Sequence, residues 1–166
     1  MYLIYLYINF VDENKLLKYA IDYLSKYDSS KENLHNVLKR KIFKSVSTNK
    51  EKGNLINSLN KIILKLEDNK LIDDKRYTES KIYTFSKLAK SKNYIYKYLL
   101  QKGINKSEIL NAFKSFEKEN FDWELKSAES FVRKKRLLES SDSYEKKIGK
   151  MARAGFSYEI CKKLLN

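Results

Sequence analysis

Histidine and cysteine, two residue types that often act as a base or a nucleophile, each occur once in this chain. His35 is the only histidine and Cys161 is the only cysteine. A catalytic histidine needs a nucleophile within reach and a carboxylate that orients its ring, which spacing alone does not show, so we expect a surface or half-buried role. Lys162 and Lys163 could favour the Cys161 thiolate, but a single cysteine on the inner face of a terminal helix is more typical of a small apolar filler.

The acidic pair Asp73 and Asp74 is the other feature with potential chemistry. A hard metal ion needs several oxygen ligands, and no second acidic cluster follows at helical spacing. Asp73 instead fits the N-cap of the next helix, where its carboxylate can accept from unpaired backbone N–H groups. The chain also lacks a glycine-rich phosphate loop and the HExxH and GxSxG motifs. We therefore expect a protein without catalytic activity, metal or other cofactor.

Positive charge is the strongest chemical signal. The 35 lysines and arginines oppose 21 aspartates and glutamates, which gives a formal net charge of +14. A surplus of this size indicates a polyanionic or acidic partner. The joint excess of Lys, Asn, Ile and Tyr is also typical of A+T-rich codons, so part of the lysine content could be codon drift. Because such drift would replace Arg with Lys, the five arginines carry more information.

All five arginines fall in four basic clusters, each expected near a helix end. One cluster alone is explained by a solvated face or by attraction to a helix C-terminus. Four together indicate planar, bidentate contacts to phosphate or carboxylate. The clusters are Lys39, Arg40 and Lys41; Lys75 and Arg76; Arg133, Lys134, Lys135 and Arg136; and Arg153 with Lys162 and Lys163.

Composition and periodicity both predict an all-α fold. The chain has no proline and four glycines, whereas sandwiches and barrels need these residues at their many turns. Apolar residues recur every three or four positions, as at Leu55, Leu59, Ile62 and Leu66, and so line one side of a helix. We expect nine helices, over residues 15–27, 30–43, 55–69, 74–90, 94–102, from 106, 122–136, 143–154 and 157–165.

Polar residues mark where the first helices begin and end. Asp12 is expected to cap the first helix, and Ser29 followed three residues later by Glu32 has the pattern of a capping box before the second. The stretch 45–54 contains Gly53 and no periodic apolar residue. It is therefore expected to be a loop.

Repeated turns predict three similar units. Gly103 and Gly155 lie 52 residues apart, each suited to a left-handed backbone just past a helix, and Phe156 follows the second. Lys41–Ile42 matches Gly103–Ile104 at a separation of 62 residues. We expect three-helix repeats at 12–70, 71–120 and 121–166. Units of about 50 residues are marginal alone, so they should stack into an elongated, curved array whose concave side binds the partner.

The apolar start of the chain, residues 1–11, is expected to be an N-terminal arm. Met1–Ile8 carries no charge, but no cationic stretch precedes it, no small-residue cleavage site follows it, and a span needs about 18 to 20 residues. A single cysteine forms no internal disulfide, which favours a reducing compartment. We therefore expect a cytoplasmic protein without a membrane partner.

Several segments of the chain resemble the RecX family of bacterial recombination regulators, in order and over about residues 14–166. They are Leu71–Tyr77 (LIDDKRY), Tyr98–Ile104 with Ile109, Arg133–Leu137, Ala152–Ile160 (ARAGFSYEI), and Ala20–Leu24 with the cap at Ser29 and Ser30.

The resemblance implies a non-enzymatic protein of three tandem three-helix repeats that binds the RecA recombinase; we expect it to be a monomer. Proteins of this family lie along the groove of the RecA–DNA filament and mainly inhibit its extension, ATP turnover, strand exchange and coprotease activity in DNA repair and the SOS response. The matched segments carry over seven basic residues, Lys75, Arg76, Lys102, Arg133, Lys134, Arg136 and Arg153. Together with the rest of the four clusters, these residues define the candidate basic surface.

A second hypothesis is a stand-alone DNA-binding protein, since small three-helix units with a basic third helix resemble helix-turn-helix modules. Such modules need base-reading side chains at the start of the recognition helix. Ser157, Tyr158 and Glu159 stand there and offer one acid but no bidentate purine reader. This hypothesis ranks second, and contact with single- or double-stranded DNA stays open in both.

Overall fold

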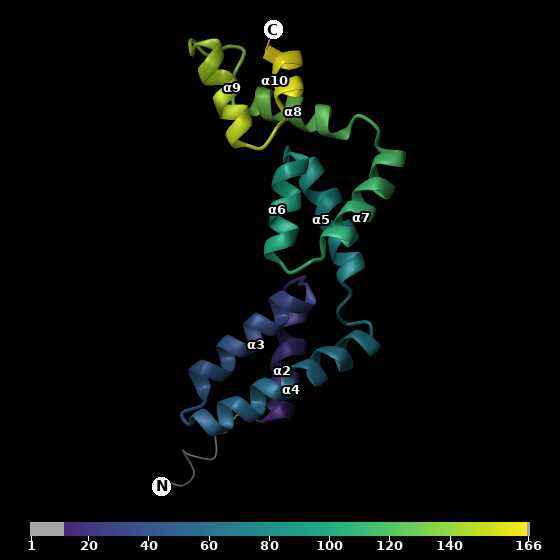
Figure 1. The fold of residues 1–166 in the computed structure, drawn as a ribbon, viewed down its shortest axis with the longest axis vertical. Coiled ribbons are helices and arrows are strands. Elements are labelled where there is room, and N and C mark those ends of the chain that lie inside the picture. Colours follow the sequence, from purple (N-terminus) through teal and green to yellow (C-terminus); the bar gives the residue numbers. More distant parts are fainter. Residues whose placement is uncertain (1–11, 166) are drawn as a thin grey trace. The chain divides into compact units, whose positions relative to one another are not determined.

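The computed structural model describes residues 12–165, and these form nine α-helices without a β-strand (Figure 1). The predicted all-α fold is thereby confirmed. In chain order the helices are α2 (Glu13–Leu24), α3 (Lys31–Ser45), α4 (Asn49–Asp68), α5 (Asp74–Lys87), α6 (Lys92–Gln101), α7 (Lys106–Glu119), α8 (Trp123–Lys134), α9 (Tyr144–Arg153) and α10 (Tyr158–Leu165). No helix of this described part has the length and apolar character that a membrane span requires. The predicted N-terminal arm, residues 1–11, lies outside the described residues.

The helices form two compact units, one ending at Tyr77 and the other beginning at Thr78. The first unit contains α2, α3, α4 and the start of α5. The second contains the rest of α5 and the helices from α6 to α10. The division into three repeats at 12–70, 71–120 and 121–166 is a finer partition of the chain, and it stays a prediction.

Aspartates cap two of the helices at the predicted positions. The Asp12 carboxylate accepts a hydrogen bond from the backbone N–H of Lys15 at 2.8 Å. Asp73 accepts from the backbone N–H of Arg76 at 3.0 Å. Both carboxylates satisfy N–H groups that have no partner within the first turn of a helix.

The capping box expected at Ser29 and Glu32 is wrong by one residue. Ser30 is the N-cap of α3, and its hydroxyl accepts from the backbone N–H of Asn33 at 3.2 Å. Glu32 is exposed and accepts from the side-chain amide of Asn36 at 3.1 Å. Two adjacent serines both fit the start of this helix, so residue spacing alone does not identify the cap.

The loop expected at residues 45–54 is mostly helical. α4 begins at Asn49 with Thr48 as its N-cap, so Gly53 lies inside the helix. The Thr48 hydroxyl accepts from the backbone N–H of Glu51 at 3.4 Å and donates to the Glu51 carboxylate at 2.6 Å. The prediction fails because the first turns of α4 are largely exposed and therefore show no apolar periodicity.

Lys41–Ile42, matched above to Gly103–Ile104, lies inside α3, which continues without a break to Ser45. This pair therefore does not correspond to Gly103–Ile104. Instead, α3 has 15 residues where α6 has 10, and α4 has 20 where α7 has 14. The additional residues of the first unit lengthen its helices rather than a loop.

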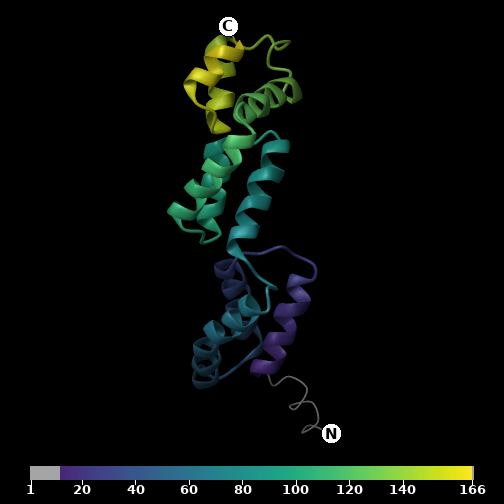
Figure 2. The same cartoon turned by 90° about the vertical axis from the view of Figure 1, so that its right-hand side faces the viewer.

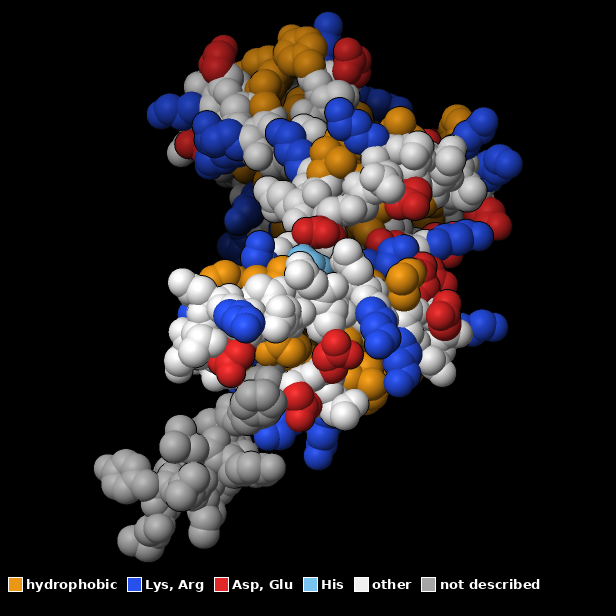
Figure 3. Space-filling model, turned by 60° about the horizontal axis from the view of Figure 1, so that its bottom comes forward, with side chains coloured by type: hydrophobic (Ala, Val, Ile, Leu, Met, Phe, Trp, Pro, Cys, Tyr) orange, Lys and Arg blue, Asp and Glu red, His pale blue; other side chains and the backbone are white. Residues whose placement is uncertain are grey.

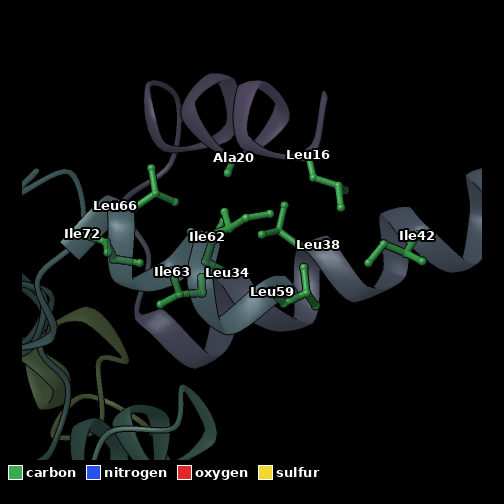
Figure 4. Close-up of a cluster of buried hydrophobic side chains, with 10 residues drawn as sticks. All are labelled: Leu16, Ala20, Leu34, Leu38, Ile42, Leu59, Ile62, Ile63, Leu66 and Ile72. Atoms are coloured by element: carbon green, nitrogen blue, oxygen red, sulfur yellow. The ribbon is translucent and has the colours of Figure 1, made fainter. Parts of the chain in front are cut away.

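The core of the first unit is one apolar cluster between α2, α3 and α4, whose side chains point toward one another (Figure 4). Its members are Leu16, Ala20, Leu34, Leu38, Ile42, Leu59, Ile62, Ile63, Leu66 and Ile72. Removal of these side chains from water, at about 25 cal/mol per Å² of apolar surface, is the main term that holds the three helices together.

The second unit has a separate apolar cluster where α10 packs beside α8 and α9 (Figures 1 and 2). Its members are Ala128, Val132, Leu137, Met151, Phe156 and Cys161. Earlier in the chain of this unit, the rings of Phe113 and Trp123 stack with their centroids 6.0 Å apart and join α7 to α8.

Two glycines end helices of the second unit in the left-handed conformation. Gly103 has a φ of 78° and Gly155 has a φ of 92°. After each glycine, the backbone N–H of the next residue, Ile104 or Phe156, donates to a helix carbonyl five residues earlier. Both following residues are buried, so each turn is closed by a hydrogen bond and by an apolar contact.

The turn at Gly155 also packs closely against the start of α6. A Cβ atom added to Gly155 would lie 2.5 Å from the Oγ atom of Ser91. That hydroxyl donates to the carbonyl of Ala154 at 2.7 Å. Glycine is therefore required here both by the backbone angle and by the space available.

The first unit contains a lysine that contacts two acidic residues. Lys31, the first residue of α3, donates its backbone N–H to Asp74 Oδ1 at 2.8 Å. Its ammonium group pairs with Glu67 Oε1, also at 2.8 Å. Through one residue, the start of α3 is thus tied to the end of α4 and to the start of α5.

The same contact recurs in the second unit. Lys92, the first residue of α6, donates its backbone N–H to Glu124 Oε1 at 2.9 Å, and its ammonium group pairs with Glu117 Oε1 at 2.7 Å. In both cases a serine N-cap precedes the lysine. Recurrence of the same contact at equivalent helix positions is typical of a repeated three-helix unit.

Candidate interaction surface

The candidate basic surface lies on the outside of both units. Of its thirteen residues, Lys41 and Lys102 are half-buried and the others are exposed. On the face drawn in Figure 3, the Lys and Arg side chains lie scattered among acidic and uncharged ones. The members in the first unit are Lys39, Arg40, Lys41, Lys75 and Arg76; those in the second are Lys102, Arg133, Lys134, Lys135, Arg136, Arg153, Lys162 and Lys163. Each unit therefore carries its own part of the surface.

Helix electrostatics explains one group of these cations. Positive side chains are favoured at the C-terminus of a helix, where the carbonyl groups leave a partial negative charge. The members of the candidate basic surface in the last turns of α8, α9 and α10 are Arg133, Lys134, Arg153, Lys162 and Lys163. For these five residues, a structural reason exists beside any functional one.

A second group of five has no such reason, and the remaining three residues, Lys102, Lys135 and Arg136, lie just past the ends of α6 and α8. Lys75 and Arg76 lie in the first turn of α5, where the positive end of the helix disfavours a cation. Lys39, Arg40 and Lys41 lie a full turn before the end of α3, so the expectation that every cluster lies near a helix end is wrong for them. Attraction to a helix C-terminus therefore does not explain these five cations.

The arginines take no part in the ion pairs of the described residues. Ion pairs of the described residues include Lys31–Glu67 at 2.8 Å, Lys61–Glu13 at 3.9 Å, Lys92–Glu117 at 2.7 Å and Lys150–Asp142. Within residues 12–165, the guanidinium groups of Arg40, Arg76, Arg133, Arg136 and Arg153 are exposed and have no carboxylate partner. All five are thus available for an external anion.

Arg136 additionally has an unfavourable backbone conformation. Its φ is 49°, in the left-handed region that costs a residue with a Cβ atom about 1 to 2 kcal/mol. It follows the last turn of α8, and the backbone N–H of Leu137 donates to Val132 O at 3.0 Å across it. Glycine is the usual residue at such a position, so Arg136 has local backbone strain that a glycine would not have.

Arg133 and Arg136 line a shallow pocket of about 310 Å³ at the end of α8. Its other lining residues are Glu129, Val132, Leu138, Glu139 and Leu164. An apolar floor with charges of both signs around it resembles the centre and rim of a protein–protein interface. This pocket suits a side chain of a protein partner.

The sequence did not single out an aromatic pocket on α6, here called the α6 pocket. It has a volume of about 240 Å³ and is lined by Asn93, Tyr94, Lys97, Tyr98, Gln101, Arg153, Ala154 and Gly155. The α6 members share one helix face, a pattern visible in the sequence from their spacing. The approach of Arg153 to that face depends on the packing of the Gly155 turn, which no local pattern predicts.

The single histidine and the single cysteine are not part of an assembled site. His35 is half-buried in α3. Cys161 is buried in the cluster between α8, α9 and α10, and burial raises the pKa of its thiol because the thiolate would lose its hydration. In the described part of the chain, no group of three or more His, Cys, Asp or Glu residues is arranged to hold a metal ion.

The described residues thus form an all-α protein whose surface carries five exposed arginines without a carboxylate partner. Such a surface is typical of a binding protein. No family model matches the chain. Its sequence is 28% identical over 155 residues to a protein of Myxococcus xanthus named "Regulatory protein RecX", covering 89% of this chain and 82% of that relative.

The fold is that of RecX. The crystal structure of RecX from Lactobacillus salivarius matches with a TM-score of 0.66 and 24% identity, over 92% of this chain and 93% of the other. A second crystal structure of regulatory protein RecX matches with a TM-score of 0.63 and 23% identity, over 93% and 78% of the two chains. Sequence and fold together confirm the resemblance to the RecX family.

Proposed function

We propose that this chain is a regulatory protein that binds the RecA recombinase filament. In this proposal it mainly inhibits filament extension, ATP turnover, strand exchange and coprotease activity during DNA repair. It acts by binding, without catalysis or a cofactor, as a monomer in the cytoplasm. The similarity to a relative named "Regulatory protein RecX" supports the regulatory role in this proposal. The observation that carries the proposal is the set of five exposed arginines without a carboxylate partner in residues 12–165.

The proposal includes three tandem three-helix repeats with boundaries near residues 70 and 120. The lysine contact described above supports this division, because Lys31 and Lys92 each join a helix start to acids of the two following helices. Those acids are spaced alike, at Glu67 and Asp74 and at Glu117 and Glu124. A shared junction of this kind is expected where similar units follow one another along a chain.

The two compact units allow contacts to be divided between neighbouring recombinase protomers. Each unit has its own exposed cations, which would meet acidic side chains of the recombinase or phosphates of its DNA. Once one unit is bound, the second binds at a high effective concentration, so a filament should be bound far more tightly than a free recombinase monomer. Because the contacts are largely ionic and exposed, salt should weaken binding steeply.

Co-sedimentation tests this proposal. RecA is assembled on single-stranded DNA with a slowly hydrolysed nucleotide, and the protein is added before the filaments are pelleted. We expect the protein in the pellet with filaments and in the supernatant with DNA-free RecA, with less pelleting as salt rises. Equal affinity for filament and monomer, or binding indifferent to salt, would contradict the proposal.

The stand-alone helix-turn-helix hypothesis gains no support from α10. Glu159 lies in its first turn, and hydrogen bonds from its own backbone N–H and from Ser157 lower the pKa of its carboxyl group. An exposed carboxylate at this position would repel the phosphates on either side of a major groove. We therefore retain recombinase binding as the single proposed function.

A further inference from the structure

The α6 pocket has an aromatic floor whose rings are held in place by a third ring. Phe85 of α5 packs edge-to-face against Tyr94, with centroids 5.7 Å apart, and against Tyr98, with centroids 4.8 Å apart. Such contacts fix ring orientation beyond what simple burial provides. Tyr94 remains 39% exposed, so its ring is both positioned and accessible.

Four polar side chains around this floor have no partner inside the described chain. Within residues 12–165, the side chains of Asn93, Lys97, Gln101 and Arg153 make no hydrogen bond and no ion pair. Four unengaged polar side chains around one pocket are available for a ligand. Two of them are amides, which can both donate and accept, and two are cations.

Charge separates this pocket from two other pockets in the second unit. Its lining has two cations and no carboxylate. The pocket at the end of α8 contains Glu129 and Glu139 beside its arginines, and another, near Trp123, contains Glu119 and Asp122 beside its lysines. The α6 pocket is therefore the one of these three whose charge selects for an anionic ligand.

More cations lie next to the aromatic rings. The Lys90 ammonium lies 4.5 Å from the centroid of the Tyr94 ring, and the Lys102 ammonium lies 5.6 Å from that of Tyr98. The arrangement thus alternates rings and positive charges along α6. Aromatic rings interleaved with cations are the common device by which proteins bind single-stranded nucleic acids.

We propose that the α6 pocket binds a single-stranded nucleic acid, with one unpaired base on the Tyr94 ring. Lys97 and Arg153 hold the flanking phosphates, and the amides of Asn93 and Gln101 bond to the base edge. A volume of about 240 Å³ is below the range of about 300 to 1,000 Å³ for pockets that hold larger cofactors, which fits one planar ring. A duplex keeps its bases stacked and offers only phosphates, so a single strand is preferred.

The close packing of the Gly155 turn brings the two parts of this pocket together in the folded chain. Arg153 belongs to α9 and the tyrosines to α6. The turn approaches α6 closely enough that a Cβ atom on Gly155 would meet Ser91. The proposal does not depend on recombinase binding, and its test contains no recombinase, so the two can fail separately.

The test is fluorescence anisotropy of a labelled single-stranded thymidine 20-mer titrated with the full chain and with two leucine variants. Tyr94→Leu should weaken binding about 10-fold through the loss of base stacking. Tyr83→Leu is the matched control, because Tyr83 is also exposed and has a lysine, Lys87, over its ring at 5.3 Å, yet lies outside the pocket. It should bind like the unchanged chain.

Two further measurements separate stacking from charge. Arg153→Gln should reduce the slope of log affinity against log salt by about 0.7, the value for one lost phosphate contact on a single strand, whereas Tyr94→Leu should leave the slope unchanged. An abasic strand of equal length should bind the unchanged chain about 10-fold more weakly than the thymidine strand. If circular dichroism shows that Tyr94→Leu does not fold, Lys97→Glu replaces it as the pocket variant. Its control is Lys114→Glu on α7. Only Lys97→Glu should then lose binding of the thymidine strand.

Several results would overturn the proposal. Equal effects of the pocket and control variants, or equal affinity for the abasic and thymidine strands, would reduce the interaction to net charge. Tighter binding of a duplex of the same sequence would exclude an unstacked base. Binding of polyglutamate that is lost in Tyr94→Leu, with the thymidine strand unaffected, would assign the pocket to an acidic protein instead.

Discussion

At the scale of single residues, the arginines and several lysines differ in whether they form ion pairs within the described chain. Several lysines have structural roles, such as the ion pairs of Lys31 and Lys92 within each unit. The five arginines have no such pairs in the described residues. Because the planar guanidinium group is suited to bidentate contacts with phosphate and carboxylate, the arginines are the best residues with which to test binding.

Arg136→Gly separates function from stability. Glycine relieves the left-handed backbone, so the free energy of unfolding should rise by about 1 kcal/mol. Filament binding should weaken by about two- to fivefold, as for an exposed ionic contact. Urea unfolding and the co-sedimentation assay measure the two effects.

Lys70→Gly is the matched control for this variant, because Lys70 is an exposed cation with a φ of 58° outside the candidate basic surface. It should gain similar stability and bind as before. Equal loss of binding in both variants would show that net charge matters rather than Arg136 itself.

At the scale of helices and turns, the sequence predicts most elements, and its errors have physical causes. Periodic apolar residues and aspartate caps locate α2, α5 and most later helices, since both signals are local. The start of α4 is missed because an exposed helical turn has no apolar pattern. The α6 pocket is missed because Arg153 reaches it only through tertiary packing, and local sequence contains no record of that contact.

The Gly155 turn should be sensitive to the smallest side chain. Gly155→Ala places a Cβ atom on a left-handed backbone and 2.5 Å from Ser91 Oγ, so we expect a loss of about 1 to 3 kcal/mol in unfolding free energy. Gly53→Ala is the control, because nothing lies within 4 Å of that Cβ position inside α4, and it should stabilise by about 0.5 to 1 kcal/mol. Equal effects of the two substitutions on urea unfolding would contradict this description of the turn.

The junction between α6 and α8 should give a measurable pH dependence. Burial raises the pKa of Glu124 above its ordinary value of 4.5, and Glu117 raises it further, although the N–H and charge of Lys92 act against this. The folded state thus holds the proton more tightly than the unfolded state, so stability falls as pH rises above 4.5 and through the raised pKa.

Glu124→Gln keeps an oxygen to accept from the backbone N–H of Lys92 but does not titrate. Between pH 4.5 and 7, its free energy of unfolding should therefore decline less than that of the unchanged chain. Urea unfolding at several pH values measures this difference, with Glu119→Gln on the exposed side of α7 as control. Parallel pH profiles for the unchanged chain and Glu124→Gln would contradict the assigned role of burial.

At the scale of the whole molecule, two compact units each carry exposed cations. A protein of this kind gains affinity and selectivity when its target presents the same site repeatedly. A recombinase filament has that property, and a free protomer does not. Contacts that bridge protomers of a growing polymer should also affect many subunits through a single bound molecule.

The most direct test of this account is the rate of DNA-stimulated ATP hydrolysis by RecA with the protein present at far less than one copy per recombinase. We expect the rate to fall well below that of RecA alone, and the fall to be smaller when Arg133, Lys134 and Arg136 are all changed to Ala in a chain that remains folded by circular dichroism. An unchanged rate at every ratio, together with tight binding of the protein to duplex DNA, would contradict filament regulation and favour a stand-alone DNA-binding protein.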